Sequence, residues 1–109
     1  MIELEAAEGR LRDINETIRE TGDAIDLPAL AREIAECEQE MAEPTFWDDV
    51  DRAQKFSKHA KSLSDKADRY ARLVRRAEDA GALIEIANEE NDASMVPEIL
   101  EEIDALAAD

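Results

Sequence analysis

The sequence predicts an all-α fold, an antiparallel helical bundle built along one long helix at about residues 49–90 with three shorter helices. Two observations support this prediction. The chain has only three Gly and three Pro among 109 residues, so few positions interrupt a helix. Apolar residues recur in every segment at alternating steps of three and four, which places them on one face of a helix.

The first helix is expected at about residues 2–20. Its apolar stripe consists of Leu4, Ala7, Leu11, Ile14 and Ile18. The following Thr21-Gly22-Asp23 is interpreted as a stop, because Gly22 suits the left-handed residue that often follows a helix.

The second helix is expected at about residues 27–42. Asp26 is a suitable N-cap, and Pro28 falls in the first turn, where its missing N–H is tolerated. The stripe consists of Leu27, Leu30, Ile34, Cys37 and Met41. Because Glu36 and Glu38 flank Cys37 and disfavour a thiolate, this cysteine is interpreted as a small core residue. Pro44 ends the helix.

The long helix carries a heptad seam, the pattern of a helix that packs one stripe against partner helices. The seam consists of Ala53, Phe56, Ala60, Leu63, Ala67, Tyr70, Val74, Ala77, Gly81 and Ile84. Thr45 or Asp48 is the candidate cap. Beyond Ala77 the apolar set widens to include Leu83 and Ile86, and Gly81 is interpreted as a bend or a tight helix crossing.

The last helix follows an acidic loop at residues 88–92, with Ser94 as the candidate N-cap and Pro97 in the first turn. Its wide apolar face reaches almost to Asp109, where the helix looks unfinished. We therefore expect residues 1–109 to form a single helical domain, the N-terminal fragment of a longer protein.

The net charge of −16 argues against a general nucleic-acid binder, because phosphate contacts require clustered Lys and Arg. Residues 52–76, called here the basic segment, nevertheless hold nine of the 13 Lys and Arg residues and only two acidic residues. Two interpretations remain open. Acidic neighbours pair with these cations, or the segment contacts RNA or an acidic protein surface. Lys55, Lys58 and Lys61 are the candidate contact residues if the second interpretation holds.

Phe46 and Trp47 precede the long helix and allow two interpretations. They form a hydrophobic plug that closes one end of the bundle, or they form an exposed anchor for a partner, since Trp is frequent at binding hot spots.

The sequence offers no catalytic constellation. His59 is the single histidine, the glycines are isolated, and a metal site built from Glu98, Glu101 and Glu102 would need ligands from other elements. We expect no enzyme activity, cofactor, metal or small-molecule substrate. No 18-residue apolar run or secretory signal is found, so neither a membrane span nor a membrane partner is expected. A lone cysteine fits a cytoplasmic setting.

Two stretches carry a resemblance to a known family. They are Pro44-Thr45-Phe46-Trp47-Asp48-Asp49 with the following Arg52-Ala53-Gln54-Lys55, and Gly81-Ala82-Leu83-Ile84-Glu85-Ile86-Ala87 with the acidic Glu89-Glu90-Asn91-Asp92. Together they resemble the N-terminal domain of the bacterial peptide chain release factor 2 family, which is a class I release factor family. The resemblance covers the chain from about Asp26 to its end.

The resemblance implies a role in translation termination, in which such factors recognise stop codons and trigger peptidyl-tRNA hydrolysis. The family's codon-reading Ser-Pro-Phe and its Gly-Gly-Gln motif do not occur in these 109 residues, so no catalytic residue is assigned. For this domain the resemblance implies docking near the ribosomal stalk base. The implied partners are the stalk-base protein, the release-factor GTPase and the remaining domains of the chain, with a local rRNA contact left open. The alternative is a free-standing acidic helical adaptor or coiled-coil interaction protein.

Overall fold

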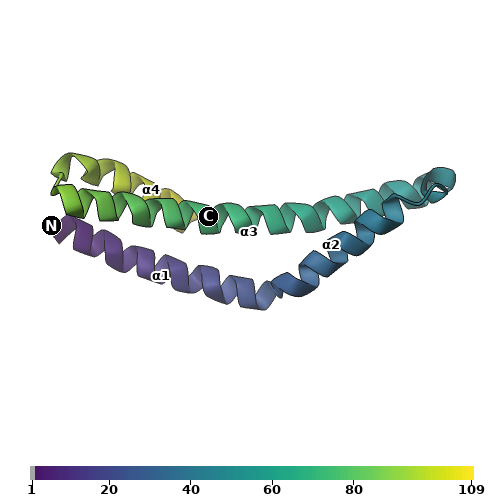
Figure 1. The fold of residues 1–109 in the computed structure, drawn as a ribbon, viewed down its shortest axis with the longest axis horizontal. Coiled ribbons are helices and arrows are strands. Elements are labelled where there is room, and N and C mark those ends of the chain that lie inside the picture. Colours follow the sequence, from purple (N-terminus) through teal and green to yellow (C-terminus); the bar gives the residue numbers. More distant parts are fainter. Residues whose placement is uncertain (1) are drawn as a thin grey trace. The chain divides into compact units, whose positions relative to one another are not determined.

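The computed structural model describes residues 2–109, which contain four α-helices and no strand (Figure 1). The helices are α1 (Ile2–Ile25), α2 (Leu27–Met41), α3 (Val50–Glu90) and α4 (Val96–Ala108), with short 3-10 turns η1 (Phe46–Asp48) and η2 (Ala93–Met95). The predicted all-α architecture with one long helix and three shorter ones is confirmed. The chain divides into two compact units. Unit 1 contains the chain up to Thr21 together with Ala71–Asp109, and unit 2 contains Gly22–Tyr70.

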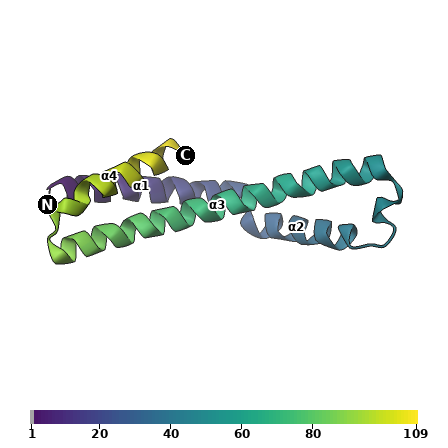
Figure 2. The same ribbon diagram turned by 90° about the horizontal axis from the view of Figure 1, so that it is seen from above.

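Unit 1 holds the larger hydrophobic core. The first part of α1 and the whole of α4 lie along the C-terminal part of α3 (Figures 1 and 2). The buried core residues come from all three helices and are Leu4, Ala7, Leu11, Ala77, Ala80, Ile84, Ala87, Ile99, Ile103 and Leu106. The α3 members of this core are mostly alanine and those of α1 and α4 are mostly leucine and isoleucine, so the helices can approach closely while the core stays filled.

Unit 2 is thinner. Within it α2 runs beside the first part of α3 in the opposite direction (Figure 2). Its buried apolar residues are Leu30, Cys37, Phe46 and Ala53. Cys37 therefore occupies the core position predicted for it. The seam residues of α3 from Phe56 to Tyr70 are only half-buried, because this unit has fewer helices to cover them.

The predicted seam of α3 matches the observed burial. Each of its ten members is buried or half-buried. The wider apolar set predicted beyond Ala77 is correct for Leu83 but wrong for Ile86, which is 43% exposed. Gly81 lies inside α3 next to Leu11, where an added Cβ would make an ordinary 3.6 Å contact with Leu11 Cδ2, so no tight crossing requires a glycine there.

Asp26 performs two roles between α1 and α2. Its φ of 58° places it in the left-handed region, where it ends α1, and its carboxylate accepts a hydrogen bond from the Ala29 N–H at 3.3 Å. The predicted N-cap and the predicted Pro28 in the first turn are confirmed. The predicted stop at residues 21–23 is wrong, because α1 continues to Ile25 and Gly22 has no positive φ.

Gly22 serves close packing instead of a turn. It is buried, and a Cβ added to it would lie 2.4 Å from Tyr70 Oη and 2.9 Å from Tyr70 Cζ. The Tyr70 ring end therefore occupies the space that any larger side chain on α1 would need. The glycine lets α1 and α3 approach each other within unit 2 at a helix-propensity cost of about 1 kcal/mol relative to Ala.

The caps of α3 and α4 differ from the predicted ones. Asp49 caps α3, since its carboxylate accepts the Arg52 N–H at 3.1 Å, whereas Thr45 makes no side-chain cap and Asp48 belongs to η1. Asn91, with φ 49°, ends α3. The Asn91 and Asp92 N–H groups bond back to Asn88 and Ala87, as in a Schellman motif.

Ser94 was predicted to cap α4, and this is wrong because η2 intervenes. Ser94 instead donates from its N–H and its hydroxyl to the Asp92 carboxylate. These bonds, the hydroxyl first, lower the pKa of Asp92. Pro97 lies in the first turn of α4 as predicted. Among residues 2–109, no helix combines the length and the apolar character needed to cross a membrane.

We predict that Gly22→Ala destabilises the protein by about 1–2 kcal/mol, because the new methyl group displaces the Tyr70 ring and this overpacking outweighs the gain in helix propensity. The matched control is Gly9→Ala, where the added Cβ meets only the end of the flexible Arg12 side chain at 3.6 Å. That control gains about 0.5–1 kcal/mol. Urea unfolding followed by circular dichroism measures both. In a Tyr70→Ala background, Gly22→Ala becomes neutral or stabilising. Equal stabilisation by both Gly→Ala changes in the wild-type background contradicts the proposed packing role.

Candidate interaction surface

The connection between α2 and α3 places two adjacent aromatic residues in different environments. Residues 42–51 are called here the tip. Phe46 is 4% exposed and belongs to the core of unit 2, whereas Trp47 is 55% exposed. The turn η1 produces this difference, because its tight backbone directs consecutive side chains to different sides.

The buried Phe46 ring lies close to two other aromatic rings. Its centroid lies 5.2 Å from that of Trp47 at an interplanar angle of 88°, and 5.5 Å from that of Phe56 at 72°. Both are edge-to-face arrangements, which are favourable for aromatic pairs. The Trp47 ring therefore packs against the buried Phe46 ring, and much of its own surface faces solvent.

The two predicted interpretations of the aromatic pair thus apply to different residues. Phe46 packs into the end of unit 2, and Trp47 remains accessible to a partner. Val50, also 55% exposed, was not predicted as part of this surface. The available signal was that Val50 is an apolar residue at the start of the long helix that lies outside the seam.

The tip is rich in exposed carboxylates. Residues 43–51 contain four acidic residues and no Lys or Arg. Glu43, Asp48 and Asp51 are exposed, and Asp49 is the cap of α3. The first cation after the tip, Arg52, pairs with Glu40, and its guanidinium carbon lies 5.9 Å from the Phe56 ring centroid. The charge of Arg52 is therefore largely balanced within unit 2.

The three candidate lysines of the basic segment lie farther along α3. Lys55, Lys58 and Lys61 are all exposed. Lys61 Nζ lies 3.1 Å from both carboxylate oxygens of Asp65, an exposed pair four residues apart on one helix. His59 is also exposed, as the sequence predicted. The basic segment is therefore accessible, and Lys61 is the one of the three lysines with an acidic partner in the described interactions.

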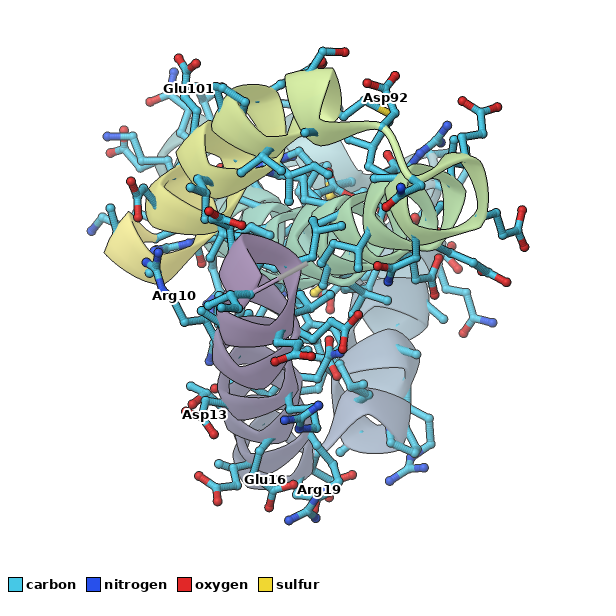
Figure 3. The ribbon with its side chains drawn as sticks, turned by 90° about the vertical axis from the view of Figure 1, so that its left-hand side faces the viewer. Arg10, Asp13, Glu16, Arg19, Asp92 and Glu101 are labelled. Atoms are coloured by element: carbon cyan, nitrogen blue, oxygen red, sulfur yellow. The ribbon has the colours of Figure 1, made fainter. Side chains whose placement is uncertain are left out.

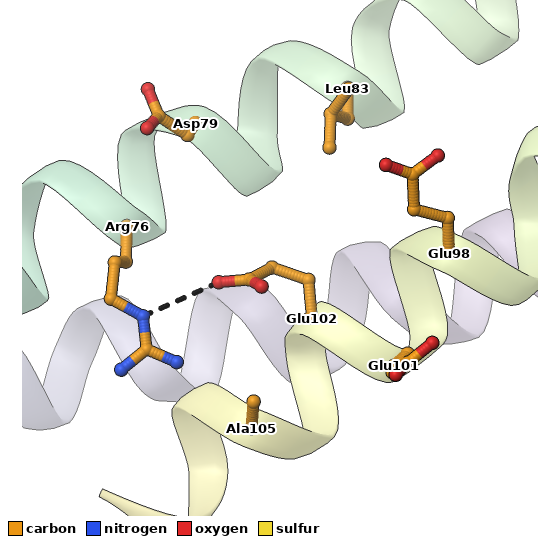
Figure 4. A pocket seen from close by; sticks show the side chains of 7 residues that line it. All are labelled: Arg76, Asp79, Leu83, Glu98, Glu101, Glu102 and Ala105. Carbon is orange, nitrogen blue, oxygen red and sulfur yellow. Dashed lines mark hydrogen bonds and ion pairs between the residues drawn. The ribbon is translucent and has the colours of Figure 1, made fainter.

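A groove of about 500 Å³ lies between α3 and α4 in unit 1 (Figure 4). Its lining residues are Arg76, Asp79, Leu83, Glu98, Glu101, Glu102 and Ala105. Arg76 Nε lies 3.4 Å from Glu102 Oε1, and Arg76 also bonds Asp109. The bond to Asp109, followed by the bond to Glu102, raises the pKa of Arg76 further above neutrality. One arginine thus compensates part of the groove's acidic lining.

The other polar contacts of unit 1 lie at its surface. Arg10 pairs with Asp104 at 2.7 Å, and Asn88 donates to Glu8 at 2.7 Å. Along α1, Asp13, Glu16 and Arg19 point away from the neighbouring helices (Figure 3). The hydrogen bond from Arg19 lowers the pKa of Glu16. Exposed pairs of this kind contribute little to stability, so they do not determine the fold.

Residues 2–109 contain no group of three or more His, Cys, Asp or Glu side chains that could hold a metal ion. Glu98, Glu101 and Glu102 all line the groove, but in this arrangement they do not form a metal site. The exposed aromatic residue of the tip and the exposed lysines of the basic segment are the candidate functional features of the described residues.

Comparison with known proteins shows to which family the chain is similar. The profile of the PCRF domain matches residues 30–109. The chain is 37% identical over 107 residues to peptide chain release factor 2 of Clostridium perfringens, which covers 98% of this chain and 29% of the relative. It is 36% identical over 104 residues to the protein of the same name from an Exiguobacterium species, covering 95% of this chain and 26% of the relative. The chain therefore spans less than a third of the length of these curated relatives.

We predict unequal losses of stability when the two aromatic residues of the tip are truncated. Phe46→Ala costs about 3–5 kcal/mol of unfolding free energy, because it empties a buried site that contacts two rings. Trp47→Ala costs about 1 kcal/mol or less, because the ring is more than half exposed. Thermal and urea denaturation measure both effects. If Phe46→Ala does not fold, Phe46→Leu provides the comparison and still costs more than Trp47→Ala. A larger loss for Trp47→Ala would show that Trp47 is the structural residue.

Proposed function

Because the chain belongs to the PCRF domain family, we propose that it is the accessory N-terminal domain of a stop-codon-recognising peptide chain release factor in bacterial translation termination. In this proposal the domain docks near the ribosomal stalk base. It contacts the stalk-base protein and communicates with the release-factor GTPase and with the remaining domains of its own chain. The domain acts by binding and carries out no hydrolysis itself. A cytoplasmic setting follows from this role.

The observation that carries the proposal is the extent of the family match. The PCRF profile covers residues 30–109, which include α3, the tip and α4. The release factor 2 relatives align over 95% or more of this chain in the two cases given above. The matched residues therefore include the exposed candidate surface and the part of the unit 1 core that α3 and α4 supply, whereas Leu4, Ala7 and Leu11 of that core lie before them.

The chemistry of the described side chains favours a binding role. Cys37 is buried, His59 is exposed on a helix, and the groove between α3 and α4 opens to solvent with Arg76 already paired. None of these residues provides a nucleophile next to a base, which acyl-transfer chemistry would require. The exposed Trp47 and the exposed lysines instead supply groups that bind partners through contact area and charge.

We predict that the purified chain co-sediments with bacterial 70S ribosomes and is displaced by release factor 2 from Clostridium perfringens, because related domains compete for one docking site. Displacement is measured by sedimentation at fixed ribosome concentration and increasing competitor. Bovine serum albumin, an unrelated acidic protein, is the control competitor and leaves binding unchanged. A chain that remains in the supernatant at micromolar ribosome concentrations contradicts the proposal and favours the free-standing adaptor.

The basic segment yields a second prediction on the local rRNA contact. Lys55→Glu with Lys58→Glu weakens ribosome binding and reduces the salt dependence of log K by about 1–2, since each lost phosphate contact removes about 0.7–0.9 from the slope. The matched control is Arg12→Glu with Arg32→Glu, which changes two exposed cations outside the segment by the same charge. Equal salt-dependence slopes for the two double variants would show that Lys55 and Lys58 make no RNA contact.

A further inference from the structure

We propose that the tip is a protein-docking surface, in which Trp47 and Val50 insert into an apolar site on a basic protein while Glu43, Asp48 and Asp51 pair with surrounding Lys and Arg. This inference rests on the proposed function and assigns one surface to a class of ribosomal partner, a basic protein surface and not rRNA.

The apolar part of the surface is preorganised. Trp47 and Val50 are each 55% exposed. The Phe46 ring packs against the Trp47 ring, with 5.2 Å between the two ring centroids. A ring held in this way loses less conformational freedom on binding than one on a loose loop. Large, supported aromatic side chains are the typical hot-spot residues of protein interfaces.

The charge around Trp47 and Val50 favours one class of partner over another. The tip presents four exposed carboxylates, Glu43, Asp48, Asp51 and the α3 cap Asp49, and residues 43–51 contain no cation. Arg52 is held by Glu40, and Lys55 begins about 7 Å along the helix axis from Val50. An RNA phosphate placed against Trp47 would therefore meet repulsive carboxylates before it reached a lysine.

A ribosome offers two surface chemistries to such a tip. RNA presents closely spaced phosphates, and the proteins that bind RNA carry Lys and Arg that neutralise phosphates. Of these two, only a basic protein surface complements an apolar pair surrounded by carboxylates. Opposite charges at the edge of an interface also speed association. The tip lies mostly before α3 and the basic segment lies within α3, so two neighbouring surfaces of unit 2 differ in the charge they favour in a partner.

The test compares variants of the whole chain for affinity to 70S ribosomes and to deproteinised rRNA from the same ribosomes. Trp47→Ala is expected to weaken ribosome binding about tenfold or more, and Trp47→Phe by a few-fold at most. Circular dichroism checks that Trp47→Ala remains folded. Asp48→Asn with Asp51→Asn is expected to weaken ribosome binding several-fold. The matched control, Asp13→Asn with Glu101→Gln, removes two exposed carboxylates of unit 1 and leaves affinity unchanged.

Each outcome is decisive. If the tip binds RNA, neutralising Asp48 and Asp51 strengthens binding to both ribosomes and deproteinised rRNA, and the inference is overturned. If the chain binds ribosomes but Trp47→Ala binds as tightly as the wild type, the inference is overturned and the proposed function stands. If the wild-type chain does not bind ribosomes, the proposed function is overturned, and the inference that rests on it is overturned too.

Discussion

The apolar seam of α3 is the constraint on which the rest of the structure depends. A helix cannot bury its own stripe, so other parts of the chain must cover it. In unit 1, α1 and α4 cover the seam, and Ala77 and Ile84 are buried. In unit 2, where α2 is the principal neighbour, the seam residues from Phe56 to Tyr70 stay half-buried. The apolar spacing of the seam is the same in both units, so the number of helices that cover it determines how deeply its residues are buried.

Periodicity predicted the helices because burial of a stripe requires only the spacing of apolar residues. The positions that periodicity could not decide are those with two valid local interpretations. Gly22 suits both a helix end and a close helix contact, and only the presence of Tyr70 opposite it decides for the second. Asp48 was predicted as a cap of α3, but the turn η1 includes Asp48 and leaves the neighbouring Asp49 at the start of α3. Likewise, nothing in the order of Phe46 and Trp47 indicates which ring the turn buries.

Charge has little part in holding this fold together. The ion pairs Arg10–Asp104 and Arg52–Glu40 lie at the surface, where such pairs contribute little. A net charge of −16 adds self-repulsion that the core must overcome. The charge pattern is therefore better explained by association than by stability. Under the proposed function, a mostly acidic surface with one basic segment would favour some partners over others, because like charges brought together disfavour association.

The division between structural and exposed residues determines how variants of this domain can be interpreted. The larger core lies in unit 1, whereas Trp47, Val50, Lys55 and Lys58 lie in unit 2 and face solvent. Loss of binding in a variant of these four residues can therefore be attributed to the surface itself. Phe46 is different, since it both fills the core of unit 2 and supports Trp47. A binding defect in a Phe46 variant could come from lost stability or from displacement of the Trp47 ring. A comparison with Trp47 variants is needed to separate the two.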